Sequence, residues 1–183
     1  ACYHSGLGQS DSTLYYFQEV GMYIKMPSKF EIVPAVDDEK LRSKGERTME
    51  EANNIDIDAS SVINLLSVRQ GQFNYLNITA TPCTQSTAVW NEENKEVNKI
   101  VYKTFADKVP PQNIDTVSTV VRVDGLVMNK FEMTLRLTPS MTMKMIMLSK
   151  LHKGHDFGIC YVFVDAVIGK EFDRIVYASL FEK

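Results

Sequence analysis

Cysteine and histidine are the side chains of this chain best suited to act as nucleophiles, bases or metal ligands, and there are few of them. The 183 residues include three cysteines, Cys2, Cys83 and Cys160, and three histidines. A zinc site typically has paired ligands such as C-x-x-C, and a disulfide framework has an even and denser set of cysteines. The spacing favours neither. A disulfide between Cys83 and Cys160 stays open as an alternative in an oxidising compartment.

The sequence contains no motif of nucleophilic catalysis. It has no G-x-S-x-G, and Cys83 has no neighbour in the sequence that would lower its pKa. Cys160 lies in an apolar run and is interpreted as a small buried hydrophobe. We therefore predict a protein without enzymatic activity. The alternative is a small hydrolase-type enzyme whose site assembles from distant residues, with His4, His152, His155 and Cys83 as the first candidates.

Two patterns could indicate a metal. His152 and His155 flank a Lys-Gly turn next to Asp156, but no third ligand accompanies them in the sequence. Methionine recurs at every second position from 141 to 147, and thioethers suit Cu(I). Methionine is also an adaptable filler of protein cores. We predict core packing for the methionine row, and neither a bound metal nor another cofactor.

The N-terminal segment suggests attachment to a membrane. Residues 1–12 are small, polar and rich in Gly and Ser, and Cys2 follows Ala1. A cysteine followed by a flexible polar stretch is typical of the acylated cysteine of bacterial lipoproteins, and acyl chains would hold a domain at a membrane surface. We predict lipid attachment at Cys2, a flexible tether over 1–13, and one domain over 14–183. An ordinary exposed cysteine is the alternative.

Composition limits the classes of partner. The formal net charge is −3, the acidic and basic residues are interspersed, and phosphate binding needs clustered Lys and Arg. We therefore predict no nucleic-acid partner. A chain of this length with 44% hydrophobic residues can bury one substantial core. No apolar run approaches the roughly 20 residues that cross a bilayer, so membrane contact is predicted only through the N-terminal lipid.

The C-terminal half has the clearest periodicity. Apolar residues alternate with polar ones over 117–123 and 127–137, on either side of Asp124-Gly125, which is a hairpin signal. The methionine row predicts a third strand. The run 157–164 is apolar on both faces, so it is predicted to be a central strand. From Ile168 the spacing becomes helical, which predicts a final helix that ends the chain and covers one face of an antiparallel sheet.

The N-terminal half is predicted to hold a hairpin, two less regular helices, a strand and a long helix. These segments are, in order, 14–34, 37–54, 58–66, 73–81 and 86–107. The charged helix 37–54 could be partly loop because Gly45 interrupts it. The short helix 58–66 is predicted because Asp58 and Ser60-Ser61 can cap it. Trp90 is interpreted as a packing residue rather than a ligand platform.

Several of these segments resemble the PsbP-like superfamily, which includes the extrinsic P subunit of photosystem II, the Mog-type Ran-binding protein and many bacterial lipoproteins. The run Tyr23-Ile24-Lys25-Met26-Pro27-Ser28-Lys29-Phe30 is similar to the opening of that fold, an apolar strand that closes on Pro with an aromatic residue three positions later. Val121-Arg122-Val123-Asp124-Gly125, Cys160-Tyr161-Val162-Phe163 and the final helix follow the same layout. The resemblance covers 16–181, and the acidic stretch 37–54 is not matched.

The resemblance implies an α+β fold in which an antiparallel β-sheet is flanked by helices, an α/β/α sandwich, and a non-catalytic accessory or binding role. The leading hypothesis is a lipoprotein of the bacterial cell envelope, periplasmic or anchored to the outer membrane. Its partner would be an envelope protein or a small ligand, bound at a sheet edge or in an interhelical groove. A cytoplasmic protein-binding adaptor akin to the Mog-type branch is a further alternative to the hydrolase.

Overall fold

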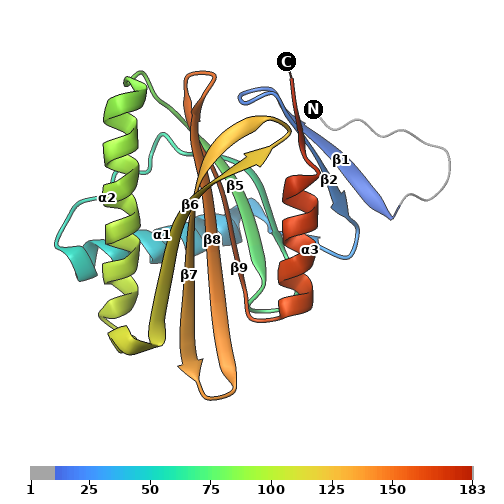
Figure 1. The fold of residues 1–183 in the computed structure, drawn as a ribbon. Helices are drawn as coiled ribbons and strands as arrows, with labels where there is room; N and C mark the ends of the chain where they lie inside the picture. The colour runs from blue at the N-terminus through green and yellow to red at the C-terminus, as the bar shows by residue number, and fades with distance from the viewer. Residues whose placement is uncertain (1–10, 183) are drawn as a thin grey trace.

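The computed structural model describes residues 11–182 and contains two antiparallel sheets and three helices (Figure 1). The elements follow the order β1 (Ser12–Phe17), β2 (Met22–Pro27), β3 (Glu31–Ile32), α1 (Ala35–Asn53), β4 (Ile63–Arg69), β5 (Tyr75–Pro82), α2 (Thr87–Ala106), a 3-10 turn η1 (Pro111–Asn113), β6 (Ile114–Val123), β7 (Leu126–Thr138), β8 (Met141–His152), β9 (His155–Phe163), α3 (Ala166–Tyr177) and β10 (Leu180–Phe181).

The main sheet has seven strands in the order β3-β4-β5-β9-β8-β7-β6, and the small sheet has three in the order β1-β2-β10. Helices α1 and α2 lie on one face of the main sheet, and α3 with the small sheet lies on the other (Figure 1). The predicted α+β class, with an antiparallel sheet between helical layers, is confirmed. Strand β9 occupies the middle of the sheet, as its apolar residues on both faces predict.

Each face of the main sheet has its own core. Toward α3 and the small sheet, the fully buried side chains include Met22, Phe157, Tyr161 and Phe172. Toward α2 a smaller cluster forms around Phe131, Met133 and Leu135 of β7 together with Val101 of α2. The methionines of β8 at positions 143, 145 and 147 pack against this second cluster. The predicted core role of the methionine row is confirmed for these three, whereas Met141 is 38% exposed at the start of the strand.

Two predicted elements are wrong. The segment around 58–66 is not a capped helix; it leads into strand β4, which pairs with β5 through a bulge between Asn64 and Leu66. Pairing with β5 and burial of Leu66 and Val68 outweigh the local capping signal. The last helix does not end the chain, because it stops at Tyr177 and β10 then pairs with β2.

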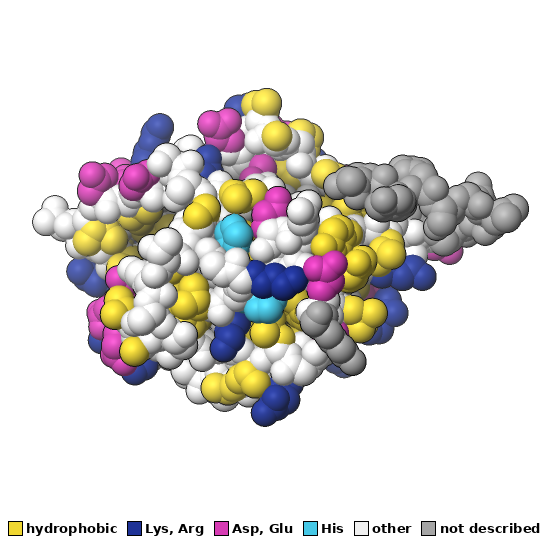
Figure 2. Space-filling model, turned by 90° about the horizontal axis from the view of Figure 1, so that it is seen from above, with side chains coloured by type: hydrophobic (Ala, Val, Ile, Leu, Met, Phe, Trp, Pro, Cys, Tyr) yellow, Lys and Arg dark blue, Asp and Glu magenta, His cyan; other side chains and the backbone are white. Residues whose placement is uncertain are grey.

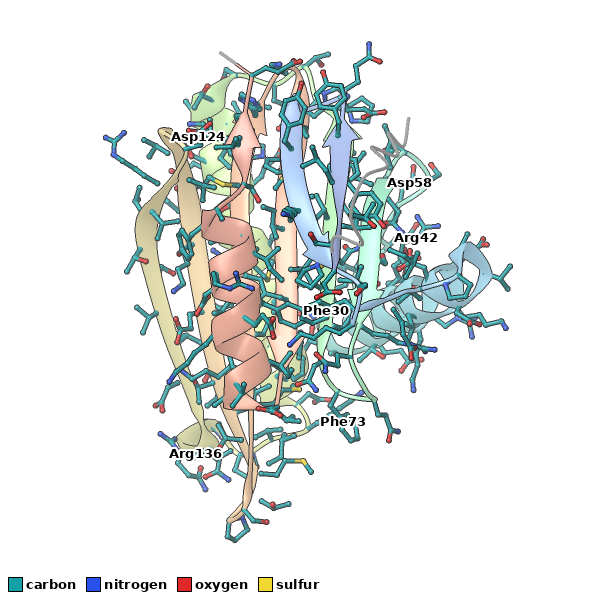
Figure 3. The ribbon with its side chains drawn as sticks, turned by 90° about the vertical axis from the view of Figure 1, so that its right-hand side faces the viewer. Phe30, Arg42, Asp58, Phe73, Asp124 and Arg136 are labelled. Carbon is teal, nitrogen blue, oxygen red and sulfur yellow. The ribbon has the colours of Figure 1, made fainter. Side chains whose placement is uncertain are left out.

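Strand β10 closes the fold by joining the small sheet to the turns of the main sheet. The backbone N–H of Phe181 donates to Oδ2 of Asp124 at 2.8 Å, in the turn between β6 and β7. Glu182 N donates to Gly21 O at 2.8 Å, and the Glu182 carboxylate pairs with Lys153 at 3.1 Å. Figure 3 shows Asp124 beside this terminal strand. Gly21 has φ +59°, which favours glycine, and a Cβ there would displace the ends of the Lys153 and Glu182 side chains.

The N-terminal boundary differs slightly from the predicted one. Strand β1 begins at Ser12, so Ser12 and Thr13 belong to the small sheet rather than to a tether over 1–13. Cys2 and His4 lie outside the described residues. In the part of the chain that is described, no helix combines the length and apolar character needed to cross a bilayer.

Helix α1 runs unbroken from Ala35 to Asn53, so the alternative that it is partly loop is wrong. Substitution of Gly45, in the middle of the helix, tests what limits its stability. A Cβ at Gly45 would meet no atom within 4 Å. Gly45→Ala should raise the free energy of unfolding by about 0.5–1 kcal/mol in urea titrations, because alanine loses less conformational entropy in a helix. Gly71→Ala is the control. A Cβ at Gly71 would also meet no atom within 4 Å, but its φ of +68° disfavours alanine, so the free energy of unfolding should fall. Destabilisation by Gly45→Ala would contradict this account of α1.

Candidate functional site

A groove lies between α1 and α2 over the middle of the main sheet. The two helices meet at one end, where Asn53 Nδ2 donates to Thr104 Oγ1 at 2.9 Å and lies 3.4 Å from Ile100 O. Away from that contact they diverge (Figure 1). Two adjoining cavities of about 500 and 240 Å³ fill the space between them and share Val62 and Thr79 as lining residues. We call these two cavities the interhelical groove.

The floor of the groove is formed by β5 and β9. Along β5 the buried residues Leu76, Ile78 and Ala80 alternate with a polar row on the groove side. In the register with β9, Thr79 lies opposite Gly158, and Asn77 lies opposite Cys160. A Cβ at Gly158 would be 3.4 Å from Thr79 Oγ1, an ordinary contact. The missing side chain of Gly158 therefore leaves the centre of the floor open.

A buried carboxylate closes one end of the groove. Asp38, in the first turn of α1, is 7% exposed. Its Oδ1 accepts hydrogen bonds from Tyr75 OH at 2.5 Å and Ser67 Oγ at 2.6 Å, and its Oδ2 accepts one from Asn64 Nδ2 at 2.6 Å. The N-terminal end of a helix favours a negative charge. Burial and the hydrogen bond to Asp38 both raise the pKa of Tyr75.

The Asp38 cluster anchors α1 to the sheet rather than forming a nucleophilic site. Its donors come from β4 and β5, and Asn77 Nδ2 adds a hydrogen bond to Ser67 Oγ at 2.8 Å. Sequence reasoning missed the cluster because its members are spread over some forty residues. The available signal was the polar alternation Tyr75, Asn77, Thr79 and Thr81 in a strand whose other face is apolar.

The opposite end of the groove is formed by the first turns of α2. Trp90 is 3% exposed, and its indole lies beside Asp156 and lowers the pKa of that carboxyl. Burial raises the pKa of Asp156, and the nearby Glu93 carboxylate raises it further, against the lowering effect of the indole. Asn94 Nδ2 donates to Ser149 Oγ of β8 at 2.9 Å and fixes α2 on the sheet. This end therefore combines aromatic packing with two neighbouring carboxylates.

Exposed apolar side chains border the groove on both sides. Leu41 of α1 is 51% exposed and Val97 of α2 is 44% exposed. On the floor, burial raises the pKa of Cys160 to about 12, so its thiol stays neutral at pH 7 and is a poor nucleophile. The arrangement offers apolar contacts along the groove and hydrogen-bond acceptors with negative charge at its ends.

Three of the residues suggested for a hydrolase, His152, His155 and Cys83, lie away from the groove, and the two histidines are the cyan side chains in Figure 2. Pro82 pairs with His155 in the register, and Cys83 N donates to Gly154 O at 2.8 Å. The backbones of positions 83 and 155 are thus close, but the side chains have other partners. Cys83 Sγ lies 3.8 Å from Gln85 Oε1, and His155 Nδ1 lies 3.0 Å from Lys153 O.

His152 has a packing role in the structure. It pairs with His155 across the turn, and its ring meets the Phe181 ring edge-on at 5.7 Å. Burial lowers the pKa of His152, and the charge of Lys153 lowers it further. Within residues 11–182, no group of three or more His, Cys, Asp and Glu side chains could hold a metal ion.

The disulfide alternative is wrong. Cys83 and Cys160 are both free thiols. Cys160 lies opposite Asn77 in the register, whereas Cys83 follows the end of β5 six residues later. At about 3.3 Å per residue the two positions are roughly 20 Å apart along the sheet, far beyond the reach of a disulfide.

Comparison with known proteins identifies the fold. No family model matches the chain, and no curated protein matches its sequence. The solution structure of cyanobacterial PsbP (CyanoP) from Synechocystis sp. PCC 6803 is similar, with a TM-score of 0.55 and 12% identity over 98% of both chains. The fold is therefore PsbP-like, as the sequence resemblance implies. At this identity the likeness is one of fold alone.

Asp38 should be a major contributor to stability. Asp38→Ala removes the acceptor of Asn64, Ser67 and Tyr75, and unsatisfied buried donors should lower the free energy of unfolding by about 3 kcal/mol in urea titrations. The control is Asp37→Ala. Asp37 is in the same helical turn but is 49% exposed and 3.6 Å from Lys40, so its loss should cost no more than about 0.5 kcal/mol. Equal effects of the two substitutions would contradict the anchoring role of Asp38.

Proposed function

We propose that this protein is a non-enzymatic, lipid-anchored protein of the bacterial cell envelope that binds a ligand in the interhelical groove. The observation that carries the proposal is the groove itself, an open space over the middle of the sheet where a compact fold would place side chains. Cavities of this size between secondary-structure elements are typical of ligand sites. The PsbP-like fold supports an accessory role, since most members of that superfamily are expected to be non-catalytic.

The proposed anchor is a lipid on Cys2. Support comes from the residue pattern around Cys2, with Ala before it and a polar Gly- and Ser-rich stretch after it. The order of the chain agrees, because such a stretch would connect the lipid directly to β1 at Ser12. The protein would then lie on the surface of a membrane of the envelope.

The groove favours a ligand with an apolar body and a cationic group. Leu41, Val97 and Met147 provide apolar contacts along the two cavities. At the α2 end, the charges of Glu93 and Asp156 disfavour one another, which is part of why the pKa of Asp156 is raised. An ammonium group between these two carboxylates would relieve that repulsion. A protein partner would meet the same chemistry with a lysine side chain on an extended segment.

The anchor is tested by expressing the full precursor in a bacterial host and measuring the intact mass of the membrane-bound protein. We expect the upstream segment to be removed and a mass increase to map to Cys2, with Cys2→Ser released into the soluble fraction. An unmodified protein in the soluble fraction of cells that make the wild-type precursor would contradict the anchor. A precursor without a signal peptide would favour the cytoplasmic adaptor.

The ligand class is tested by ligand-observed NMR with hexylamine, hexanoate and 1-hexanol. Hexylamine should bind best, and Asp156→Asn combined with Glu93→Gln should weaken it roughly fivefold, the range of a solvent-exposed ion pair. Gly158→Leu should abolish binding of hexylamine and hexanol by filling the floor. Arg47→Leu, at an exposed position on the side of α1 away from the groove, serves as the control. Unchanged binding to Gly158→Leu would exclude the groove as the site.

A further inference from the structure

The small sheet presents an apolar and aromatic outer face. Residues of β1 and β2 alternate, so Phe17, Met22 and Ile24 are buried in the core whereas their neighbours point outward. Leu14 is 51% exposed and Leu180 is 57% exposed. Between them lie Tyr16 and Tyr23, which are cross-strand partners with ring centroids 4.5 Å apart. These four side chains share one face, because Leu180 also pairs with Tyr23.

Cations border this face on the side of α3. Lys25 lies opposite Leu14 in the register, and Lys29 follows at the end of the same hairpin. Lys170 and Arg174 are one helical turn apart on the exposed side of α3. A groove of about 700 Å³ between β2 and α3 is lined by Lys25, Lys29 and Arg174. Figure 3 shows α3 and the hairpin side by side on this side of the molecule.

The positive charge is only partly neutralised. Lys29 and Arg174 both contact the same carboxylate, Glu171, with Arg174 Nη2 at 3.6 Å. Within the described part of the chain, Lys25 and Lys170 form no ion pair. Glu182 is already paired with Lys153, at 3.1 Å. The remaining acidic residue at this groove is Asp11, so four cations face two carboxylates. We call the outer face of the small sheet and the exposed side of α3 the tether face. Its positive charge gathers on the side of α3, whereas on the small sheet the Tyr16 hydroxyl donates a hydrogen bond to the Glu182 carboxylate at 2.7 Å.

The described chain begins at this same face. Asp11 lines the groove between β2 and α3, and its carbonyl accepts a hydrogen bond from Ser28 N at 2.8 Å. Cys2 precedes Asp11 by nine residues, which span at most about 30 Å when fully extended. An anchor at Cys2 would therefore keep the tether face, rather than the interhelical groove, near the bilayer.

We propose that the tether face binds the surface of a bilayer that contains anionic lipids. Tyrosine and leucine side chains enter the boundary between headgroups and acyl chains, and lysine side chains reach the lipid phosphates. The anionic surface attracts each nearby cation. The orientation at the membrane follows from the lipid anchor of the proposed function, but the chemistry of the surface does not require the anchor.

The test uses the Cys2→Ser protein, so that no acyl chain contributes. Its co-sedimentation with vesicles of phosphatidylcholine plus phosphatidylglycerol is compared with vesicles of phosphatidylcholine alone. We expect binding to the anionic vesicles that weakens with added salt. Lys25→Gln with Lys170→Gln should reduce the partition coefficient roughly 25-fold, at about fivefold per cation. The control, Lys95→Gln with Lys99→Gln, makes the same charge change on α2 and should leave binding within about twofold.

A second pair of variants tests the apolar part of the face. Leu14→Ser with Leu180→Ser should weaken vesicle binding, whereas Leu41→Ser with Val97→Ser, at comparably exposed positions bordering the interhelical groove, should not.

Equal binding to both kinds of vesicle, or equal losses in test and control variants, would overturn the proposal. It would then point to a protein partner for this face. If the protein binds vesicles but Cys2 is not acylated in cells, the membrane-binding face stands and the lipid anchor of the proposed function is wrong. If Cys2 is acylated but the Cys2→Ser protein does not bind vesicles, the anchor stands and the membrane-binding face is wrong.

Discussion

The main sheet is wider than the helices packed on it, and this constraint determines which surfaces the protein exposes. Seven strands at about 4.8 Å spacing extend roughly 29 Å, and a helix with its side chains is about 10 Å across, so full cover of one face takes about three helices. The chain supplies two helices on one face, and one helix with a small sheet on the other. On the face with two helices the uncovered part becomes the interhelical groove. On the other face the small sheet completes the cover and exposes its own outer side.

A buried charge keeps the groove open. If α1 packed on α2 along its whole length, the groove would close. Asp38 prevents this, because its carboxylate takes three hydrogen bonds from side chains of β4 and β5 and fixes the first turn of α1 far from α2. The other end of α1 is tied to α2 through Asn53 and Thr104. The first turn of α1 is thus bonded to the sheet and its last turn to α2. The helices diverge away from the second contact, and the space between them is the groove.

The parts of the fold that could be predicted from the sequence are those with a long periodic pattern of apolar residues. Strands β7 to β9 were predictable because long runs of apolar residues at every second position mark their buried faces. Strand β6 is exposed over 115–120, and it was predicted from its alternation over 117–123 and the Asp124-Gly125 turn. Strand β4 was missed since Asp58 and the serines after it resemble a helix cap, and only pairing with β5 decides otherwise. Strand β10 has two residues, and Leu180 fits the helical spacing of α3, so only the tertiary hydrogen bonds to Asp124 and Gly21 reveal it. The Asp38 cluster was missed for the same reason, because its members meet only in the folded chain.

The two proposed surfaces lie on opposite sides of the main sheet. The tether face belongs to the layer of α3 and the small sheet, whereas the interhelical groove belongs to the layer of α1 and α2 (Figure 1). Strand β9 connects them, since its Phe157, Ile159 and Tyr161 pack toward α3 while Gly158 and Cys160 form the floor of the groove. A protein resting on a membrane by its tether face would therefore present the groove to the aqueous side, within reach of a soluble ligand or of a partner that approaches from the opposite membrane. In this arrangement the seven-stranded sheet separates the two surfaces, so a contact at one would leave the other exposed.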